Sequence, residues 1–346
     1  SPTRLYFASQ RVWTSDDRGD TWKAISGDLT RNEERLEIEH MGRKWSSDAP
    51  WDLYAMSQYN TITSLAESPK QAGLLYVGTD DGLIQVSEDA GKSWRKIEVG
   101  RLPGVPKRAF VNDIKADLFD ADTVYVALDN HKGGDFKPYL YVSRDRGRSW
   151  KSMTGNLPDR HLVWRVVQDH VRKDLLFVGT EFGAFFTVDG GRRWTKLGGT
   201  PTIPFRDLAI QRRENDLVGA TFGRGFWILD DYTPLREVSE QALSTGAMLF
   251  KPREALWYIE RQNLGSRREQ KASQGVGYYA ADNPPFGAVL TYYLQEDLET
   301  RTQKRRKAEK KKIEDGKDTP FVGFDEISAE KREREPTIIL TVRDGQ

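Results

Sequence analysis

A short motif recurs four times in the chain, and this repetition restricts the possible folds more than any other feature of the sequence. The copies begin at residues 15, 87, 143 and 187, and the first three read S-x-D-x-G-x-[ST]-W. The fourth keeps the Asp, the Gly and the Trp, but has Thr at the first position and Arg at the seventh. The shortest interval between copies matches the ~40–45 residues of a four-stranded propeller blade. The longer intervals then imply inserted loops.

Each copy of the motif lies between two strand-like runs, which is typical of a hairpin turn. Its Asp carboxylate can accept hydrogen bonds from backbone N–H groups just after it, its Gly can take a positive φ, and its hydroxyl can satisfy another loop group. Its Trp carries a large apolar ring inward, against the next sheet. We therefore expect structural roles for Ser15, Asp17, Gly19 and Trp22; Ser87, Asp89, Gly91 and Trp94; Ser143, Asp145, Gly147 and Trp150; and Asp189, Gly191 and Trp194.

Apolar runs around the motifs predict about five four-stranded blades within residues 1–240. Three of the blades are complete in the sequence, whereas the first has three strand-like runs and the fifth has lost the motif. The expected strands of the complete blades are 62–68, 74–78, 83–87 and 94–99; 110–116, 123–128, 139–143 and 149–154; and 163–169, 175–179, 184–188 and 194–197. The first blade has runs at 5–9, 12–15 and 22–25, and the fifth at 205–211, 216–220 and 226–229.

The repeated motif resembles that of the Asp-box, or BNR-repeat, β-propellers, which include sialidases, xyloglucanases and sortilin-type receptors. Residues 219–231, GATFGRGFWILDD, are similar to the G-T-x-G-R-G-[IV]-W segment of bacterial sortilin-like and xyloglucanase-like proteins labelled "glycosyl hydrolase, BNR repeat". A His often stands in those proteins where Phe222 stands here. The resemblance implies an all-β propeller with more blades upstream, an extracellular or periplasmic location, and an immunoglobulin-like β-sandwich after the propeller.

The last third of the chain has a different composition. We expect closing strands and a linker over residues 241–275, and then the start of an immunoglobulin-like sandwich over 276–346, with strands at 283–294 and 336–345. A charged insertion separates these strands at about 297–335. Its segment 301–312 is mostly Lys and Arg, which favours a frayed helix or a disordered loop, and a solvated insertion rather than an anion-binding element. Both ends of the chain fall in mid-domain, so we expect a fragment of a longer protein.

Hairpin loops alternate between the two ends of an antiparallel sheet, so the four motif turns share one face and the loops between second and third strands share the other. That second face receives the connections between blades, and the longest of these, residues 26–60, is rich in aromatic residues, as binding loops are. A Trp in such a loop could equally cap the core. The candidate binding residues are Trp45, Trp51, Tyr54, His131, Glu181, Phe222 and Arg224, and the candidate catalytic carboxylates are Asp80, Asp81, Asp129 and Glu181.

Two functions fit these residues, with a scaffold role as a third. The first is a sortilin-like recognition module that binds peptide or glycan on the face opposite the motif turns. The alternative is a xyloglucanase-like glycoside hydrolase, which needs two carboxyl groups ~5–5.5 Å or ~6.5–9.5 Å apart. A sialidase is disfavoured: Arg165, Arg206 and Arg224 could point toward the propeller axis, but that family's R-I-P signature is absent.

Composition excludes several other classes of protein. The 53 basic and 52 acidic side chains leave a net charge of +1, which gives no global field for nucleic acid. No run approaches the ~18 apolar residues of a membrane helix. The absence of cysteine excludes disulfides and thiol chemistry. The four histidines form no metal-binding motif, so we expect neither a metal nor a cofactor.

Overall fold

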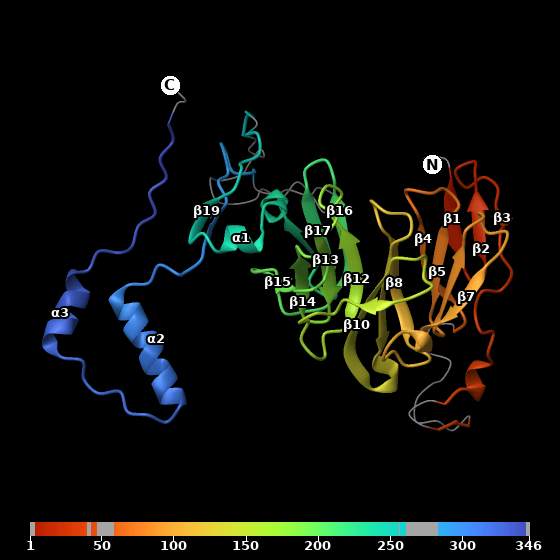
Figure 1. Ribbon diagram of the computed structural model, residues 1–346, viewed down its shortest axis with the longest axis horizontal. Coiled ribbons are helices and arrows are strands. Elements are labelled where there is room, and N and C mark those ends of the chain that lie inside the picture. Colours follow the sequence, from red (N-terminus) through yellow and green to blue (C-terminus); the bar gives the residue numbers. More distant parts are fainter. Residues whose placement is uncertain (1–3, 40–42, 47–58, 256, 261–282, 344–346) are drawn as a thin grey trace, which may run out of the picture. The chain divides into compact units, whose positions relative to one another are not determined.

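The computed structural model describes residues 4–39, 43–46, 59–255, 257–260 and 283–343 (Figure 1). The chain divides into two compact units, Ser1–Val238 and Ser239–Gln346, called unit 1 and unit 2 below. Unit 1 consists of five antiparallel sheets that follow one another along the chain. No helix in the described part of the chain has both the length and the apolar character needed to cross a membrane.

The five sheets of unit 1 confirm the all-β fold class and place most strands within a few residues of the predicted runs. The first sheet contains β1 (Leu5–Ala8), β2 (Val12–Ser15) and β3 (Lys23–Ala24). The second contains β4 (Ile62–Glu67), β5 (Leu75–Thr79), β6 (Leu83–Ser87) and β7 (Arg95–Glu98), and the third β8 (Phe110–Ala116), β9 (Val124–Asn130), β10 (Asp135–Ser143) and β11 (Lys151–Ser152). The fourth contains β12 (Val163–Gln168), β13 (Leu176–Thr180), β14 (Gly183–Thr187) and β15 (Thr195–Lys196), and the fifth β16 (Phe205–Gln211), β17 (Asp216–Thr221) and β18 (Phe226–Leu229). Four short 3-10 helices lie between strands: η1 (Arg35–Glu37), η2 (Val99–Arg101), η3 (His131–Gly133) and η4 (Thr233–Arg236).

Four strands are found in the second, third and fourth sheets, whereas the first and fifth have three, in agreement with the predicted runs. One detail of the layout differs from the expectation. The segment 129–138, expected as a loop, is mostly strand, because β9 continues to Asn130 and β10 already begins at Asp135. The η3 turn alone separates them.

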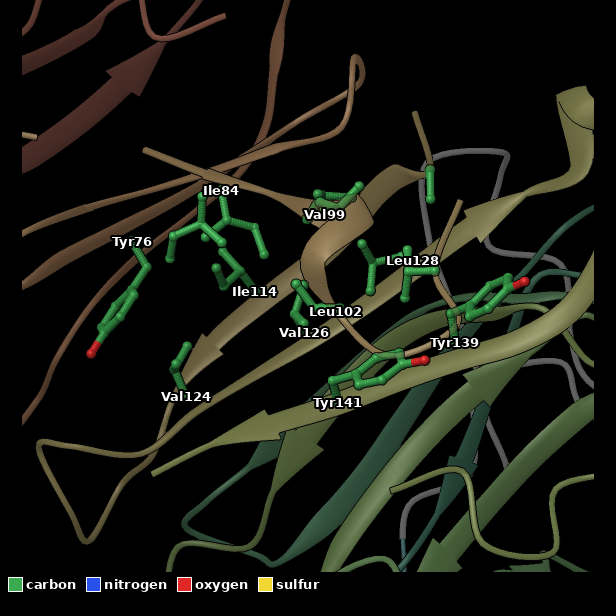
Figure 2. Close-up of a cluster of buried hydrophobic side chains, with 14 of the residues drawn as sticks. Tyr76, Ile84, Val99, Leu102, Ile114, Val124, Val126, Leu128, Tyr139 and Tyr141 are labelled. Atoms are coloured by element: carbon green, nitrogen blue, oxygen red, sulfur yellow. The ribbon is translucent and has the colours of Figure 1, made fainter. Parts of the chain in front are cut away.

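A separate apolar cluster lies at each junction between consecutive sheets. Figure 2 shows the one between the second and third sheets, where Tyr76 and Ile84 meet Ile114, Val126 and Leu128. The core of unit 1 is therefore a series of similar layers, each formed by the facing sides of two neighbouring sheets. This is how propeller blades pack.

The first strand of each of the last four sheets carries one extra residue near its start. In the second sheet Ile62 pairs with Thr79 and Ser64 with Gly78, so Thr63 has no partner in the ladder. The same register shift leaves out Asn112 in β8, Trp164 in β12 and Arg206 in β16. Such a β-bulge turns its side chain out of the normal alternation. The four bulged residues thus stand at equivalent places in successive sheets.

The motif turns have the hydrogen bonds expected from their sequence. In the second sheet Asp89 accepts bonds from the Ser93 backbone N–H at 2.9 Å and the Ser93 hydroxyl at 2.6 Å, and the Ser87 hydroxyl accepts the Gly91 N–H at 2.7 Å. Gly91 has φ +88°, which requires glycine, since a Cβ would lie 2.8 Å from the Ile25 carbonyl oxygen. The same contacts recur in the first and third copies, and Thr187 replaces the serine in the fourth.

Three of the four motif tryptophans are packed inward as expected. Trp94 packs against the cluster between the first and second sheets, and the Trp194 indole N–H donates to the carbonyl of Met153, which precedes the fourth sheet. Trp150 packs against the cluster between the second and third sheets. Trp22 differs, since it is 43% exposed and meets Phe7 edge to face. The other three rings pack beside the preceding sheet, and Trp22 belongs to the first.

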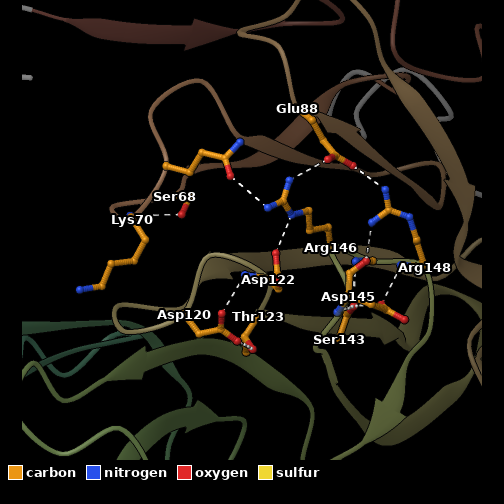
Figure 3. A network of polar contacts seen from close by, with 12 residues as sticks. Ser68, Lys70, Glu88, Asp120, Asp122, Thr123, Ser143, Asp145, Arg146 and Arg148 are labelled. Atoms are coloured by element: carbon orange, nitrogen blue, oxygen red, sulfur yellow. Dashed lines mark hydrogen bonds and ion pairs between the residues drawn. The ribbon is translucent and has the colours of Figure 1, made fainter.

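Ion pairs also link one motif turn to the neighbouring sheet. Arg146, in the turn of the third sheet, contacts Asp122 at 2.6 Å and Glu88 at 2.8 Å (Figure 3). Arg148 adds a second contact to Glu88 at 2.9 Å. This network ties the motif face of the second sheet to that of the third, on the side away from the loops considered below.

Unit 2 contains little strand and differs from the expected sandwich. Its described elements are α1 (Glu240–Leu243), β19 (Ala247–Leu249), β20 (Tyr292–Leu294), α2 (Arg301–Glu314) and α3 (Phe324–Arg332). β20 pairs with β19, and the described residues of 336–345 form no strand. The structure therefore differs here from the two strands predicted at 283–294 and 336–345. An alternating apolar segment identifies a possible strand without specifying its partner. The basic segment 301–312 is helical, with its first turn closed by a capping box between Thr300 and Gln303.

Small residues opposite the bulges allow neighbouring sheets to pack closely, and this can be tested at Gly179. A Cβ there would lie 2.5 Å from the Phe205 carbonyl oxygen of the next sheet. We expect Gly179→Ala to lower the free energy of unfolding by about 1–3 kcal/mol, as overpacking does. Gly198→Ala is the control, because no atom lies within 4 Å of a Cβ at Gly198. Urea denaturation that finds equal stability for the two variants would refute the packing argument.

Candidate functional site

A pocket of about 190 Å³ lies on the face opposite the motif turns, where the third, fourth and fifth sheets meet. The third sheet contributes one residue from the η3 turn and one from the start of β10. The fourth contributes the connection that leads into β12, the bulge of β12 and the β13–β14 turn, and the fifth contributes the bulge of β16. The lining residues are His131, Phe136, Arg160, Leu162, Trp164, Glu181, Phe182 and Arg206.

Trp164 organises the polar groups of this pocket. Its indole N–H donates to Glu181 Oε2 at 3.0 Å. The Arg206 guanidinium carbon lies 3.6 Å from the centroid of the Trp164 ring, and the His131 ring meets it edge to face at 5.9 Å. The Trp164 side chain is itself buried. It therefore acts as a support that fixes an acid, a cation and an imidazole around the opening.

His131 is held in turn by Asp129. The imidazole Nδ1 and the backbone N–H of His131 both contact Asp129 Oδ1. Asp129 is buried, and its second oxygen, Oδ2, has no hydrogen-bond partner among the described residues. This predicted catalytic carboxylate thus orients a pocket residue instead of facing the pocket.

Asp80 and Asp81 occupy the β5–β6 turn and do not line the pocket. Asp80 accepts the Thr61 backbone N–H at 2.8 Å, and burial raises its pKa to about 6. Asp81 accepts the Thr79 hydroxyl on one oxygen and the Arg31 N–H on the other, at 2.6 Å, and its side chain is completely buried. This environment favours a structural role for Asp81.

The predicted binding residues separate into two groups. His131 and Glu181 line the pocket, and Phe222 stands beside it, with the Arg206 guanidinium carbon 5.6 Å from its ring centroid. Arg224 and Trp45 do not line it, and Trp45 is covered by Arg43 at 3.6 Å. Trp51 and Tyr54 lie outside the described residues.

Trp164 and Arg206 are not among the residues that the sequence predicts to bind a ligand, although Arg206 is one of the three arginines considered able to point toward the propeller axis. Both residues fall within predicted strands. An alignment of the four strand starts, ITSL, VNDI, VWRV and FRDL, contains the missing signal. The second position is variable and never aliphatic, and it is the bulged residue.

No group of three or more His, Asp or Glu residues in the described ranges is close enough to hold a metal ion.

The chain shows limited similarity to known proteins, and no family model matches it. An oligoxyloglucan-reducing end-specific xyloglucanase of Emericella nidulans is 29% identical over 167 residues, which cover 44% of this chain and 16% of that enzyme. This chain therefore spans well under a fifth of that relative's length. The resemblance to Asp-box and sortilin-like proteins in particular is not confirmed by the comparisons.

Similar solved structures include three large proteins. An ancestral GH74 enzyme has 18% identity and a TM-score of 0.44, over 63% of this chain and 26% of its own. The GH74 xyloglucanase from Xanthomonas campestris has 22% identity and a TM-score of 0.46, over 65% and 34%. The extracellular domain of a putative one component system from B. thetaiotaomicron has 14% identity and a TM-score of 0.42, over 67% and 25%.

Because the pKa of Asp80 is raised in the folded protein, replacing this residue should increase the stability of the fold in a pH-dependent way. As the pH rises above about 4, this carboxyl ionises in the unfolded chain, where its pKa is ~3.9, while in the folded protein it stays protonated up to about 6. Its burial therefore costs stability progressively between those values and by a constant amount above them. We expect Asp80→Asn, which keeps an acceptor for Thr61, to stabilise the protein by about 1–2 kcal/mol at pH 7.5 and not at pH 3.5.

Asp89→Asn should show the opposite sign and serves as the comparison. The Ser93 hydroxyl and backbone N–H lower the pKa of Asp89 to about 2. The stability it contributes is thus present above pH 4 and lost as the pH falls toward 2. Thermal unfolding from pH 2 to 8 measures the stability of both variants relative to the unsubstituted protein. If this difference in stability changed with pH in the same way for both variants, the opposite pKa shifts of Asp80 and Asp89 would be contradicted.

Proposed function

We propose that unit 1 is a carbohydrate-binding β-propeller related to the xyloglucanases, with its sugar site in the pocket around Trp164. The observation that supports this most directly is the combination of exposed aromatic rings and open hydrogen-bonding groups in one pocket. Phe136 and Phe182 offer apolar surface, and Glu181 and Arg206 offer an acceptor and donors. The matched region of the E. nidulans xyloglucanase gives independent support for a glycan ligand.

Sugar rings present C–H faces and hydroxyl edges, and a protein binds them with aromatic faces and planar polar groups. Phe182 lies at the rim, 39% exposed, with its ring centroid 5.2 Å from that of His161. Glu181 Oε2 accepts the Trp164 N–H, which leaves Oε1 for a sugar hydroxyl. A sortilin-like peptide ligand would not need this pairing of ring faces with a single carboxylate. A location outside the cytoplasm, where polysaccharides are found, belongs to the same proposal.

Glycoside hydrolysis is the second candidate, favoured by the similarity to a xyloglucanase. Hydrolysis requires two carboxyl groups on opposite sides of the scissile bond. Glu181 is the acidic residue among the pocket-lining residues of the described chain, and Asp129 behind His131 is buried. The pocket by itself therefore supports binding more strongly than turnover.

The binding proposal predicts a loss of oligosaccharide affinity when an exposed aromatic ring of the pocket is removed. We expect Phe182→Ala to weaken binding of plant or bacterial oligosaccharides roughly 5- to 10-fold, because a stacked ring contributes about 1 kcal/mol. Isothermal titration with a panel that includes xylogluco-oligosaccharides, cello-oligosaccharides and acidic peptides measures it. Phe119→Ala is a matched control, since Phe119 is 37% exposed in the β8–β9 turn at the motif end. Binding of peptides alone would refute the proposal.

Release of reducing sugar from the same panel tests the second candidate. If unit 1 only binds, no turnover is expected from the protein or from Glu181→Gln and Asp80→Asn variants. Turnover that disappears in Glu181→Gln, with binding retained, would establish hydrolysis and assign Glu181 a direct role. Turnover that survives both substitutions would place the reacting carboxylates elsewhere.

A further inference from the structure

Two arginines line the pocket without an acidic partner among the described residues, whereas the neighbouring Arg165 is paired. Arg206 and Arg160 make no ion pair with any residue in the described chain. Arg165, which directly follows Trp164, contacts Asp113 at 3.3 Å and Asp207 at 3.1 Å. The pocket lining thus carries two guanidinium groups that no described carboxylate neutralises, although the whole chain carries a net charge of only +1.

The Arg206 guanidinium is held by ring faces instead of by a carboxylate. Its central carbon lies 3.6 Å from the Trp164 ring centroid and 5.6 Å from that of Phe222. Stacking uses the flat faces of a guanidinium and leaves its N–H edge available. That edge presents parallel donors in a geometry that matches both oxygens of a carboxylate. Arg160, with its guanidinium carbon 5.8 Å from the Phe136 ring centroid, adds a second cation to the lining.

Glu181 limits which anion the pocket can take. Its carboxylate also lines the pocket, so a dianion such as a phosphate monoester would be repelled more strongly than a single carboxylate. Its free oxygen suits a hydroxyl donor. A ligand that satisfies both sides carries one carboxylate and several hydroxyls on a ring with an apolar face.

We propose that the pocket binds a uronic acid residue of an acidic glycan. The sugar carboxylate pairs with Arg206, with Arg160 as a second cation, while a hydroxyl donates to Glu181 and the ring packs on the exposed phenylalanines. This inference rests on the proposed carbohydrate site and specifies its substrate class, which differs from an uncharged glucan.

Calorimetry with matched ligands tests the proposal. The probes are trimers of galacturonate, glucuronate and mannuronate, each compared with its methyl ester, which keeps the sugar and removes the charge. We expect at least one acid to bind roughly 10-fold or more tightly than its ester, about 1.4 kcal/mol. Arg206→Gln should remove this difference and change the affinity for the ester less than about 2-fold.

Two further variants separate charge from geometry and from general effects. Arg206→Lys keeps the charge without the planar fork and should retain only part of the preference. Arg193→Gln removes an exposed charge from the motif turn of the fourth sheet, at the other end of that sheet, and should leave both affinities unchanged. Thermal unfolding of each variant verifies that the fold is intact.

The outcomes distinguish this inference from the proposed function. Equal affinity for every acid and its ester, or binding of neutral sugars alone, would overturn the uronate site and leave the carbohydrate site standing. Failure of every sugar to bind would defeat both. An equal loss of affinity for acid and ester in Arg206→Gln would show that Arg206 supports the pocket without recognising the charge of the ligand.

Discussion

Contacts between the bulged residues of neighbouring sheets connect the architecture of unit 1 to its pocket. The Thr63 hydroxyl donates to the Val111 carbonyl of the next sheet at 2.6 Å, and the Asn112 amide donates to the Val163 carbonyl at 2.8 Å. Each bond reaches from one bulge to the residue just before the next one. A bulge frees its side chain from the ladder, so that it can bond sideways to the neighbouring sheet. One extra residue per sheet thereby fixes the register between sheets as well as within them.

The pocket is found where this series changes its chemistry. At the next junction the bulged residue is Trp164, whose ring has no strong donor for a backbone carbonyl other than its N–H, and that N–H is bonded to Glu181. The junction is completed by Arg206 stacking on the ring. The guanidinium of Arg206 on the Trp164 ring takes up more space than the Thr63 hydroxyl on the Val111 carbonyl oxygen. The donors of Arg206 also stay open, so that a structural contact at two junctions is replaced at the third by open hydrogen-bond donors in a pocket.

The repeated sheets could be predicted from the sequence because their determinants are local. The Asp and Gly of each motif act within one turn, so Asp89 and Gly91 identify it without knowledge of the fold. The bulges could not be predicted in this way, since a single inserted residue interrupts alternation no more than an ordinary polar substitution does. The inward packing of a motif Trp depends on a neighbouring sheet, which the local motif does not specify. The partner of β20 is likewise set by the tertiary fold, and alternation alone left it open.

The positions of the carboxylates in unit 1 bear on the choice between binding and hydrolysis. Acid and base catalysis by two carboxyl groups requires environments that move their pKa values apart at one substrate. Burial raises the pKa of Asp80, but Asp80 belongs to the β5–β6 turn of the second sheet and is bonded to Thr61. Glu181 faces the pocket from the β13–β14 turn of the fourth sheet. Asp80 therefore lies in one place and the pocket in another, and the residues that surround Glu181 are cations and rings. A hydrolytic partner for Glu181 would have to come from outside this pocket.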